Sequence, residues 1–179
     1  MHAHAAQQLI DRLRMTRIPQ EGPWFAPTFR ADESVAFTAP AAAARYAGPR
    51  AAYSAIYCVL TREDFSALHR LASDDLWHFY DGAPVELLQL HPDGRAETTL
   101  LGRDLADGQH PQLRVPRGVW QAARPLGGAD AWSFIGNTLA PAFDYADFEI
   151  GYRDELQARF PASAERIAAF TRAEFARRP

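Results

Sequence analysis

Turn-forming residues recur about every eight to twelve residues between positions 53 and 139, and this spacing limits the fold more than any other feature of the chain. The segments between the turns are about five to eight residues long and are rich in β-branched, aromatic and leucine residues. Short strands separated by regular turns are typical of all-β sandwiches and barrels. The strands are predicted at 53–60, 66–70, 75–80, 85–90, 96–101, 112–116, 119–123 and 131–139.

The residues before this region have other patterns. Apolar positions at helical spacing predict a short helix over residues 4–15. Residues 18–30 contain three prolines, which favour an extended segment at a sheet edge over a helix. The Ala/Pro-rich residues 31–50 follow no clean period and are predicted as a loop, which either varies freely or acts as a lid.

Helical periodicity returns after the last predicted strand. Residues 153–160 and 163–177 are predicted as two helices, the second with Ile167 and Phe170 on its inner face. No internal repeat and no second domain is recognisable, and 179 residues are enough to bury one substantial core. We therefore predict a single domain with an N-terminal helix at 1–17, a barrel at 18–150 and a helical tail at 151–179.

Composition excludes several classes of partner and location. Nineteen Lys and Arg against 22 Asp and Glu give a formal charge of −3, and no basic tract is present that could bind nucleic acid. No run approaches the roughly 18 apolar residues that a membrane-spanning helix needs, and no signal peptide is recognisable, so we expect a cytoplasmic location. The single cysteine, Cys58, lies in an apolar run and is interpreted as a buried structural thiol.

The stretch from Ser66 to Gly82 carries an unusual density of polar side chains within a strand pattern. It contains His69 and His78, two adjacent aspartates and a tryptophan between apolar positions. Residues two apart on a strand point to the same side of the sheet, so Asp75 and Trp77 share one face and His78 lies on the other. A strand bulge could reverse this parity, and His78 therefore stays a candidate.

An ordered series of motifs runs from about Ile18 to Pro161. The most specific are His69-Arg-Leu-x-Ser-Asp-Asp-Leu-Trp-His-Phe-Tyr-x-Gly82, Leu101-Gly-Arg-Asp-Leu105, Gly108-Gln-x-Pro-Gln112, Val115-Pro-x-Gly-Val-Trp-Gln-Ala-Ala123 and Ala140-Pro-x-Phe-Asp-Tyr-x-Asp-Phe-Glu149. In these motifs the chain resembles the cupin superfamily, specifically its small DUF985-like group, whose members are described as predicted sugar epimerases. The resemblance implies an all-β cupin fold, the double-stranded β-helix or jelly-roll barrel, and a homodimer.

The resemblance also bears on metal binding. Matched to the metal-binding cupin pattern, His69 takes the place of the first histidine and Asp75 that of the acid. Leu71 falls where the second histidine belongs, and Gln121 where the last one does. Because a transition-metal site needs three or four converging N, O or S donors, we expect no metal cofactor. A metal held by His69 and Asp75 is the alternative.

Without a metal, the matched positions imply a polar pocket inside an apolar barrel. A neighbouring His69 and Asp75 would form a pair suited to proton transfer near neutral pH; the alternative is a hydrogen-bonded pair that only stiffens the barrel. Amides and aromatic faces suit carbohydrate-like ligands, although the tryptophans could equally belong to the core. The candidate substrate-binding residues are Trp77, His78, Gln112, Gln121, Trp120, Glu21, Arg30 and Glu149.

The entrance segment departs from the pattern of the group that it resembles. Pro27 stands in place of an acid and Phe29 in place of a tyrosine, so a carboxylate and a phenol are missing from an expected pocket wall. Asn137 stands where we expect a small residue or cysteine. The ligand is therefore expected to differ from that of other members of the group.

The sequence leads to three hypotheses of function. The first is a metal-independent isomerase, epimerase or lyase that acts by proton transfer on a sugar-like or other small polar ring metabolite, with His69 and Asp75 as acid and base. The second is a non-catalytic binding module or sensor that uses the same pocket. The third, a metal-dependent oxygenase, requires a bound metal.

Overall fold

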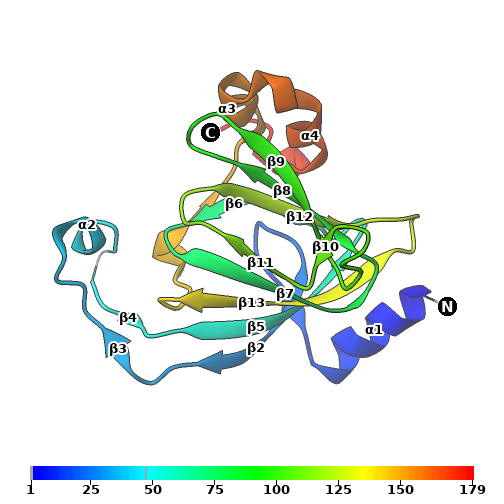
Figure 1. Ribbon diagram of the computed structural model, residues 1–179, viewed down its shortest axis with the longest axis horizontal. Helices are drawn as coiled ribbons and strands as arrows, with labels where there is room; N and C mark the ends of the chain where they lie inside the picture. Colours follow the sequence, from blue (N-terminus) through cyan, green and yellow to red (C-terminus); the bar gives the residue numbers. More distant parts are fainter. Residues whose placement is uncertain (1, 47) are drawn as a thin grey trace.

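The computed structural model describes residues 2–46 and 48–179, with side chains from His4 onward. Within this part of the chain the strands form two six-stranded sheets and one two-stranded ribbon (Figure 1). The first sheet has the order β1 (Thr16–Arg17), β2 (Trp24–Arg30), β5 (Ser54–Thr61), β13 (Trp132–Ala140), β7 (Asp74–Gly82) and β11 (Gln112–Val115). The second has the order β10 (Gln109–His110), β9 (Ala96–Leu101), β8 (Val85–Leu90), β12 (Trp120–Pro125), β6 (Ser66–Leu71) and β14 (Phe148–Ile150).

The central core lies between the two sheets. Leu60, Trp77 and Ile135 project into it from the first sheet, and Leu87 and Leu101 project from the second. All five side chains are at most 2% exposed. Alternation along the strands thus fills the interior of a barrel, and it confirms the all-β cupin fold that the turn spacing and the motifs predict.

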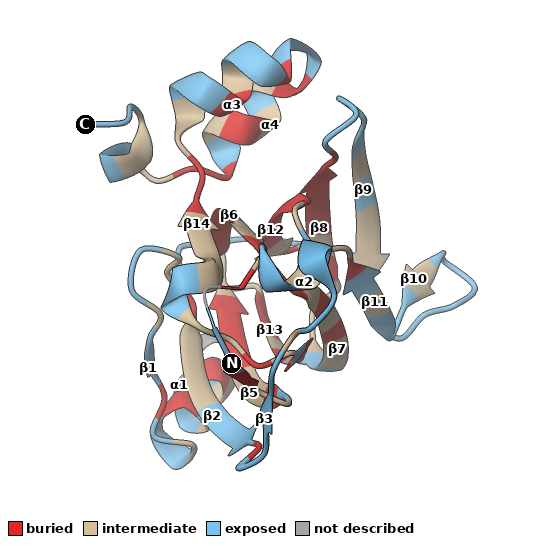
Figure 2. Cartoon of the chain, turned by 90° about the vertical axis from the view of Figure 1, so that its left-hand side faces the viewer, coloured by how far each residue is buried: buried red, intermediate tan, exposed pale blue. Residues whose placement is uncertain are grey.

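Helices cover the outer face of both sheets (Figure 1). Helix α1 (His2–Arg12) packs Ala6 and Ile10 against Val59 and Trp132 of the first sheet. Helices α3 (Arg153–Arg159) and α4 (Ala164–Ala169) cover the second sheet, with the single turn η2 (Pro161–Ser163) between them. Figure 2 shows the result for β8, which is buried along most of its length.

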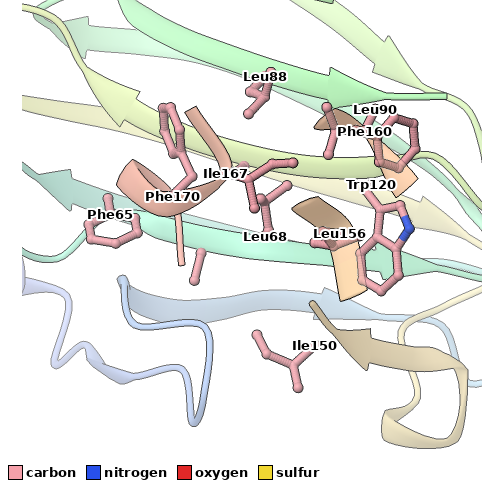
Figure 3. Close-up of a cluster of buried hydrophobic side chains, with 12 residues drawn as sticks. Phe65, Leu68, Leu88, Leu90, Trp120, Ile150, Leu156, Phe160, Ile167 and Phe170 are labelled. Carbon is pink, nitrogen blue, oxygen red and sulfur yellow. The ribbon is translucent and has the colours of Figure 1, made fainter. Parts of the chain in front are cut away.

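The outer core under α3 and α4 explains the apolar run of β8. Leu88 and Leu90 point away from the barrel interior and pack with Ile167 and Phe160 of the helical tail (Figure 3). Residues of this strand therefore meet apolar partners on both faces, which is why its sequence does not alternate strictly between apolar and polar side chains.

The second C-terminal helix is shorter than the predicted 163–177. It ends at Ala169, and Phe170 leaves the helical conformation to pack edge-on against Phe65, with ring centroids 6.2 Å apart. Arg172 then turns back and donates hydrogen bonds to the carbonyl oxygens of Phe65 and Glu21, at 2.8 and 3.1 Å. Contacts with the barrel thus override the helical periodicity, and only the short turn η3 (Ala173–Phe175) follows.

The segment predicted as a loop over 31–50 contains short elements. Strands β3 (Ser34–Val35) and β4 (Arg50–Ala51) pair with each other, and the one-turn helix α2 (Pro40–Ala43) lies between them. Arg50 donates to both carboxylate oxygens of Asp147 at 2.7 and 2.8 Å, and this ion pair is buried. The far end of the segment is therefore tied to the turn η1 (Tyr145–Asp147).

In the described part of the chain, no helix is long and apolar enough to cross a membrane.

Candidate functional site

A cavity of about 230 Å³ lies within the barrel, with walls from β2, β5, β6, β7 and β13 and from the segment that leads into β14. Its polar lining residues are Glu21, Arg30, Ser54, His69, Asp75, Asn137 and Tyr145. Its other lining residues are Ile18, Pro27, Phe29, Ala55, Ile56, Cys58, Leu71, Trp77, Leu139, Phe143 and Phe148. The cavity combines a largely apolar and aromatic wall with a small set of convergent polar groups, which is the usual composition of a small-molecule site.

Asp75 is a buried carboxyl group of the cavity. It lies on β7, is only 4% exposed, and accepts hydrogen bonds from Asn137 Nδ2 at 3.0 and 3.2 Å and from Gln121 Nε2 at 2.9 Å. Burial raises the pKa of Asp75 to about 6, although the bonds from Asn137 and Gln121 favour the charged form. The carboxyl group can therefore gain or lose a proton close to neutral pH.

Gln121 connects Asp75 to His69. Trp77 Nε1 donates to Gln121 Oε1 at 2.9 Å, which fixes the orientation of the amide. The amide nitrogen, Nε2, then lies 2.9 Å from Asp75 Oδ2 and 3.1 Å from His69 Nε2. His69 Nδ1 lies 2.8 Å from the carbonyl oxygen of Ala67, and because a carbonyl only accepts, Nδ1 carries the hydrogen and Nε2 accepts from Gln121.

Glu21 brings a second carboxylate to the cavity. Its Oε1 accepts a 2.6 Å hydrogen bond from Ser66 Oγ and lies 4.0 Å from His69 Nδ1. Cys58 also lines the cavity, but burial raises the pKa of its thiol well above the ordinary value, and the carboxylates of Glu21 and Asp75 act in the same direction. The thiol is therefore poorly suited to act as a nucleophile.

Two of the sequence candidates lie on the outer face of the first sheet. His78 contacts Thr138 Oγ1 at 3.1 Å and Gln112 Nε2 at 3.2 Å, and Gln112 is exposed on β11. The bulge in β7 falls after His78, opposite the step from Phe134 to Ile135, so the alternation from Asp75 to His78 is undisturbed. Neither His78 nor Gln112 lines the cavity.

Two other candidates lie on the outer face of the second sheet. Trp120 is 6% exposed and packs in the outer core under the helical tail (Figure 3), with the guanidinium of Arg70 4.6 Å from the centre of its ring. Glu149 is partly exposed and accepts a 2.7 Å hydrogen bond from Arg70 Nε. Both side chains are on the wrong face of their strands to reach the cavity, and Gln121 reaches it only through Asp75 and His69.

The sequence marked Asn137 as a departure from the pattern of the group but did not predict its contact with Asp75. The residue lies beside Trp77 in the register of β13 and β7, and its amide reaches diagonally to Asp75. The available signal was a lone amide in an apolar strand, at the same parity as Ile135 and Leu139. Phe143, Tyr145 and Phe148 were also missed as lining residues, because nothing local in their motif shows that the chain folds back over the barrel opening.

The side chains in the cavity do not fit a tightly held transition metal. In the described part of the chain, no group of three His, Cys, Asp or Glu side chains is arranged to hold one. Leu71 lines the cavity where a further nitrogen donor would be needed. Both oxygens of Asp75 and both ring nitrogens of His69 are already engaged in hydrogen bonds within the protein.

Comparisons with known proteins agree with this architecture. An X-ray structure of a protein from Shewanella oneidensis has 28% sequence identity and a TM-score of 0.80, and the match covers 93% of this chain and 97% of that one. A hypothetical protein from Leishmania major has 29% identity and a TM-score of 0.80, covering 93% and 98%. A mutant of the oxalate decarboxylase of Bacillus subtilis, with 10% identity, a TM-score of 0.50 and coverage of 87% and 37%, is similar in fold alone.

None of the curated proteins matches the chain. The family model described as "Cupin superfamily (DUF985)" matches residues 7–151, which is most of the sequence and nearly all of the barrel. This match confirms the resemblance seen in the motifs. The protein therefore belongs to the DUF985 family of the cupin superfamily.

Proposed function

We propose that the protein is a metal-independent isomerase, epimerase or lyase that moves a proton on a small polar ring metabolite, with Asp75 and His69 as acid and base. The observation that carries the proposal is that both side chains line one cavity and are joined by one amide, that of Gln121. Two titratable groups held in fixed positions at a buried site can serve as the acid and the base of a proton transfer.

Asp75 is the proposed base. Its ionised form removes a proton from a carbon next to a carbonyl, and the pKa of about 6 keeps a large fraction of the carboxyl ionised at neutral pH. Donation of a proton by His69 to the opposite face of the same carbon gives an epimer, and return of the proton from Asp75 to a neighbouring carbon gives an isomer. If a hydroxyl on the adjacent carbon leaves with a proton from His69, the products are water and an unsaturated compound.

His69 is the proposed acid, and it acts through Nε2. Its Nδ1 is bound to the carbonyl oxygen of Ala67, so the second proton of the ring must be taken up at Nε2. In the proposed step a ligand oxygen replaces Gln121 Nε2 as the partner of Nε2 and receives the proton there.

The dimensions of the cavity favour a small substrate. A volume of about 230 Å³ lies below the range of about 300–1,000 Å³ typical of pockets for drug-sized ligands. Trp77, Phe143 and Phe148 supply flat apolar surfaces, while Glu21 and Asn137 supply an acceptor and a donor for hydroxyl or carbonyl groups. A sugar-like ring with one polar edge matches this distribution.

Native mass spectrometry of the purified protein should first identify a ligand that copurifies with it. That ligand is then incubated in D₂O with the wild type, with Asp75→Asn and with His69→Ala. We expect the wild type to introduce solvent deuterium at the reacting carbon and both variants to slow turnover by about 10²–10⁴-fold. Asp74→Asn and His110→Ala, which change a partly exposed and an exposed residue outside the cavity, are the matched controls.

A non-catalytic binding module is the second candidate. It is favoured by the fact that both oxygens of Asp75 already accept hydrogen bonds, as expected of a group that serves stability. A ligand recovered unaltered and without deuterium would support this function and contradict the enzymatic one.

The proposal includes a homodimer in the cytoplasm. Three large aromatic side chains of the first sheet and its flanks are 44–49% exposed, which is consistent with a partner surface there: Phe29, Tyr53 and Tyr80. Light scattering after size-exclusion chromatography should give twice the chain mass, and a monomer would contradict this part of the proposal.

A further inference from the structure

Arg30 lies at the rim of the cavity because β2 contains a bulge. The register of β2 against β5 shifts between Pro27 and Phe29, which leaves Thr28 as the extra residue. Pro27 lines the cavity before the bulge, and without the shift Arg30 would lie on the opposite face. The bulge instead brings Arg30 into the cavity lining, in register with Ser54.

The guanidinium of Arg30 is held by one hydrogen bond and keeps further N–H donors for a ligand. Its Nη1 donates a 2.8 Å hydrogen bond to the carbonyl oxygen of Phe143, whose own amide nitrogen donates to Ser54 Oγ at 3.0 Å. A guanidinium has five N–H donors, so this contact fixes its position and leaves others available. Across residues 4–46 and 48–179, no carboxylate lies within 4.0 Å of Arg30.

Charge is distributed unevenly along the cavity. Arg30 is the lone Lys or Arg among the lining residues that the structure describes, and it is exposed at the rim. The two carboxyl groups, Glu21 and Asp75, are largely buried. An anionic group is therefore repelled from the interior and attracted to the rim, where an arginine can bind a carboxylate or phosphate through paired hydrogen bonds.

We propose that Arg30 selects substrates that carry a carboxylate or phosphate group, and that it binds this group at the rim while the ring lies in the cavity. The inference deepens the proposed function, on which it rests for the position of the ring. It narrows the substrate class from polar rings in general to anionic ring compounds such as sugar acids or sugar phosphates.

The proposal can be tested with pairs of probes that share a ring and differ in whether they carry an anionic group. Benzoate and benzamide form the carboxylate pair, and phenyl phosphate and phenol form the phosphate pair. Binding is followed by NMR titration, with the side-chain amide of Asn137 as the reporter inside the cavity. The comparison uses the wild type, Arg30→Gln and the control Arg103→Gln, which removes an exposed arginine outside the cavity.

We expect at least one anionic probe to bind the wild type and the control about tenfold or more tightly than its neutral partner, as charge-assisted hydrogen bonds require. Arg30→Gln should abolish that preference without weakening the neutral probe, and added salt should reduce it. The pair of probes with the larger preference for its anionic member shows whether the site favours a carboxylate or a phosphate.

Equal binding of charged and neutral probes by the wild type would overturn the proposal, as would no binding of any probe up to its solubility. An equal loss of both kinds of probe in Arg30→Gln would show that Arg30 only supports the structure. These binding readouts do not depend on turnover. Asp75→Asn should therefore keep the preference for anions, whether or not Asp75 is catalytic, and a failure of the catalytic proposal can be told apart from a failure of this one.

Discussion

The side-chain amide of Asn137 donates to both oxygens of Asp75, at 3.0 and 3.2 Å, from the neighbouring strand of the first sheet. Two opposing effects thus act on one carboxyl group. Burial raises its pKa and is the larger effect, whereas the amide hydrogen bonds lower it, and the balance is a pKa of about 6.

Replacement of Asn137 by Ala should raise the pKa of Asp75 further. The substitution removes hydrogen bonds to the charged form and leaves the burial in place. The carboxyl carbon of Asp75 can be titrated by NMR in the variant and in Thr138→Val, the adjacent residue on the other face of β13. An unchanged or lower pKa in Asn137→Ala would contradict the described balance.

Ionisation of Asp75 should oppose folding between about pH 4 and pH 6. Its pKa rises from about 3.9 in the unfolded chain to about 6 in the folded protein, so its contribution is fully present below pH 4 and is lost as pH rises. The cost reaches about 3 kcal/mol above pH 6. The side chain in Asp75→Asn cannot ionise. The difference in free energy of unfolding between Asp75→Asn and the wild type should therefore shift in favour of the variant by about that amount as pH rises from about 4 to about 6.

Urea denaturation at a series of pH values measures this difference, and Asp74→Asn serves as the control for loss of a carboxylate. A difference between Asp75→Asn and wild type that stays constant from pH 4 to pH 6 would rule out the predicted linkage.

Gln121→Leu should destabilise the protein by about 1–3 kcal/mol, because Trp77 Nε1 and Asp75 each lose a buried hydrogen-bond partner. Chemical denaturation checks the size of the effect. Gln112→Leu, at an exposed position of β11, should change the free energy of unfolding by less than about 0.5 kcal/mol. Equal effects of the two substitutions would mean that the buried network adds nothing to stability.

The ion pair of Arg50 and Asp147 should matter more than an ordinary surface pair. Both side chains are 6% exposed, so removal of one leaves the other charged and buried. We expect Arg50→Ala and Asp147→Ala each to cost on the order of 3 kcal/mol, and the double variant to cost clearly less than the sum. Additive effects in this double-mutant cycle would show that the two residues act independently.

Ile167→Ala should cost about 2–5 kcal/mol, since Ile167 is completely buried in the outer core under the helical tail. Glu165→Ala, on the exposed side of the same helix, is the control. A single unfolding transition in both variants would show that the tail and the barrel unfold together. A tail that melts first, in a separate transition, would contradict that interpretation.

Most of the strand pattern could be predicted from the sequence because turn residues and alternation are local signals. The strand predicted at 85–90 has the same bounds as β8. Parity predicts that Asp75 and Trp77 share one face of their strand, and the resemblance to the cupin pattern implies that this face is the inner one, where both residues line the cavity. The end of α4 could not be predicted, since it depends on the contact of Phe170 with Phe65 across the barrel surface.

The candidate site was predictable only in part, for a related reason. Parity identifies the strand face of a residue but does not show what covers that face. Trp120 is polar-tipped and aromatic like a ligand-binding residue, yet the tail covers its side of the sheet. The role of Asn137 depends on the register between β13 and β7, which no local pattern specifies.

The hydrogen bond from Arg172 to the carbonyl oxygen of Glu21 spans 151 positions in the chain. During synthesis, Glu21 leaves the ribosome long before Arg172 exists, and the second bond of the same guanidinium, to Phe65, forms equally late. A chain that ends before Arg172 therefore lacks both hydrogen bonds to the backbone of Glu21 and Phe65, and the backbone that carries a cavity carboxylate loses a support that only the tail supplies.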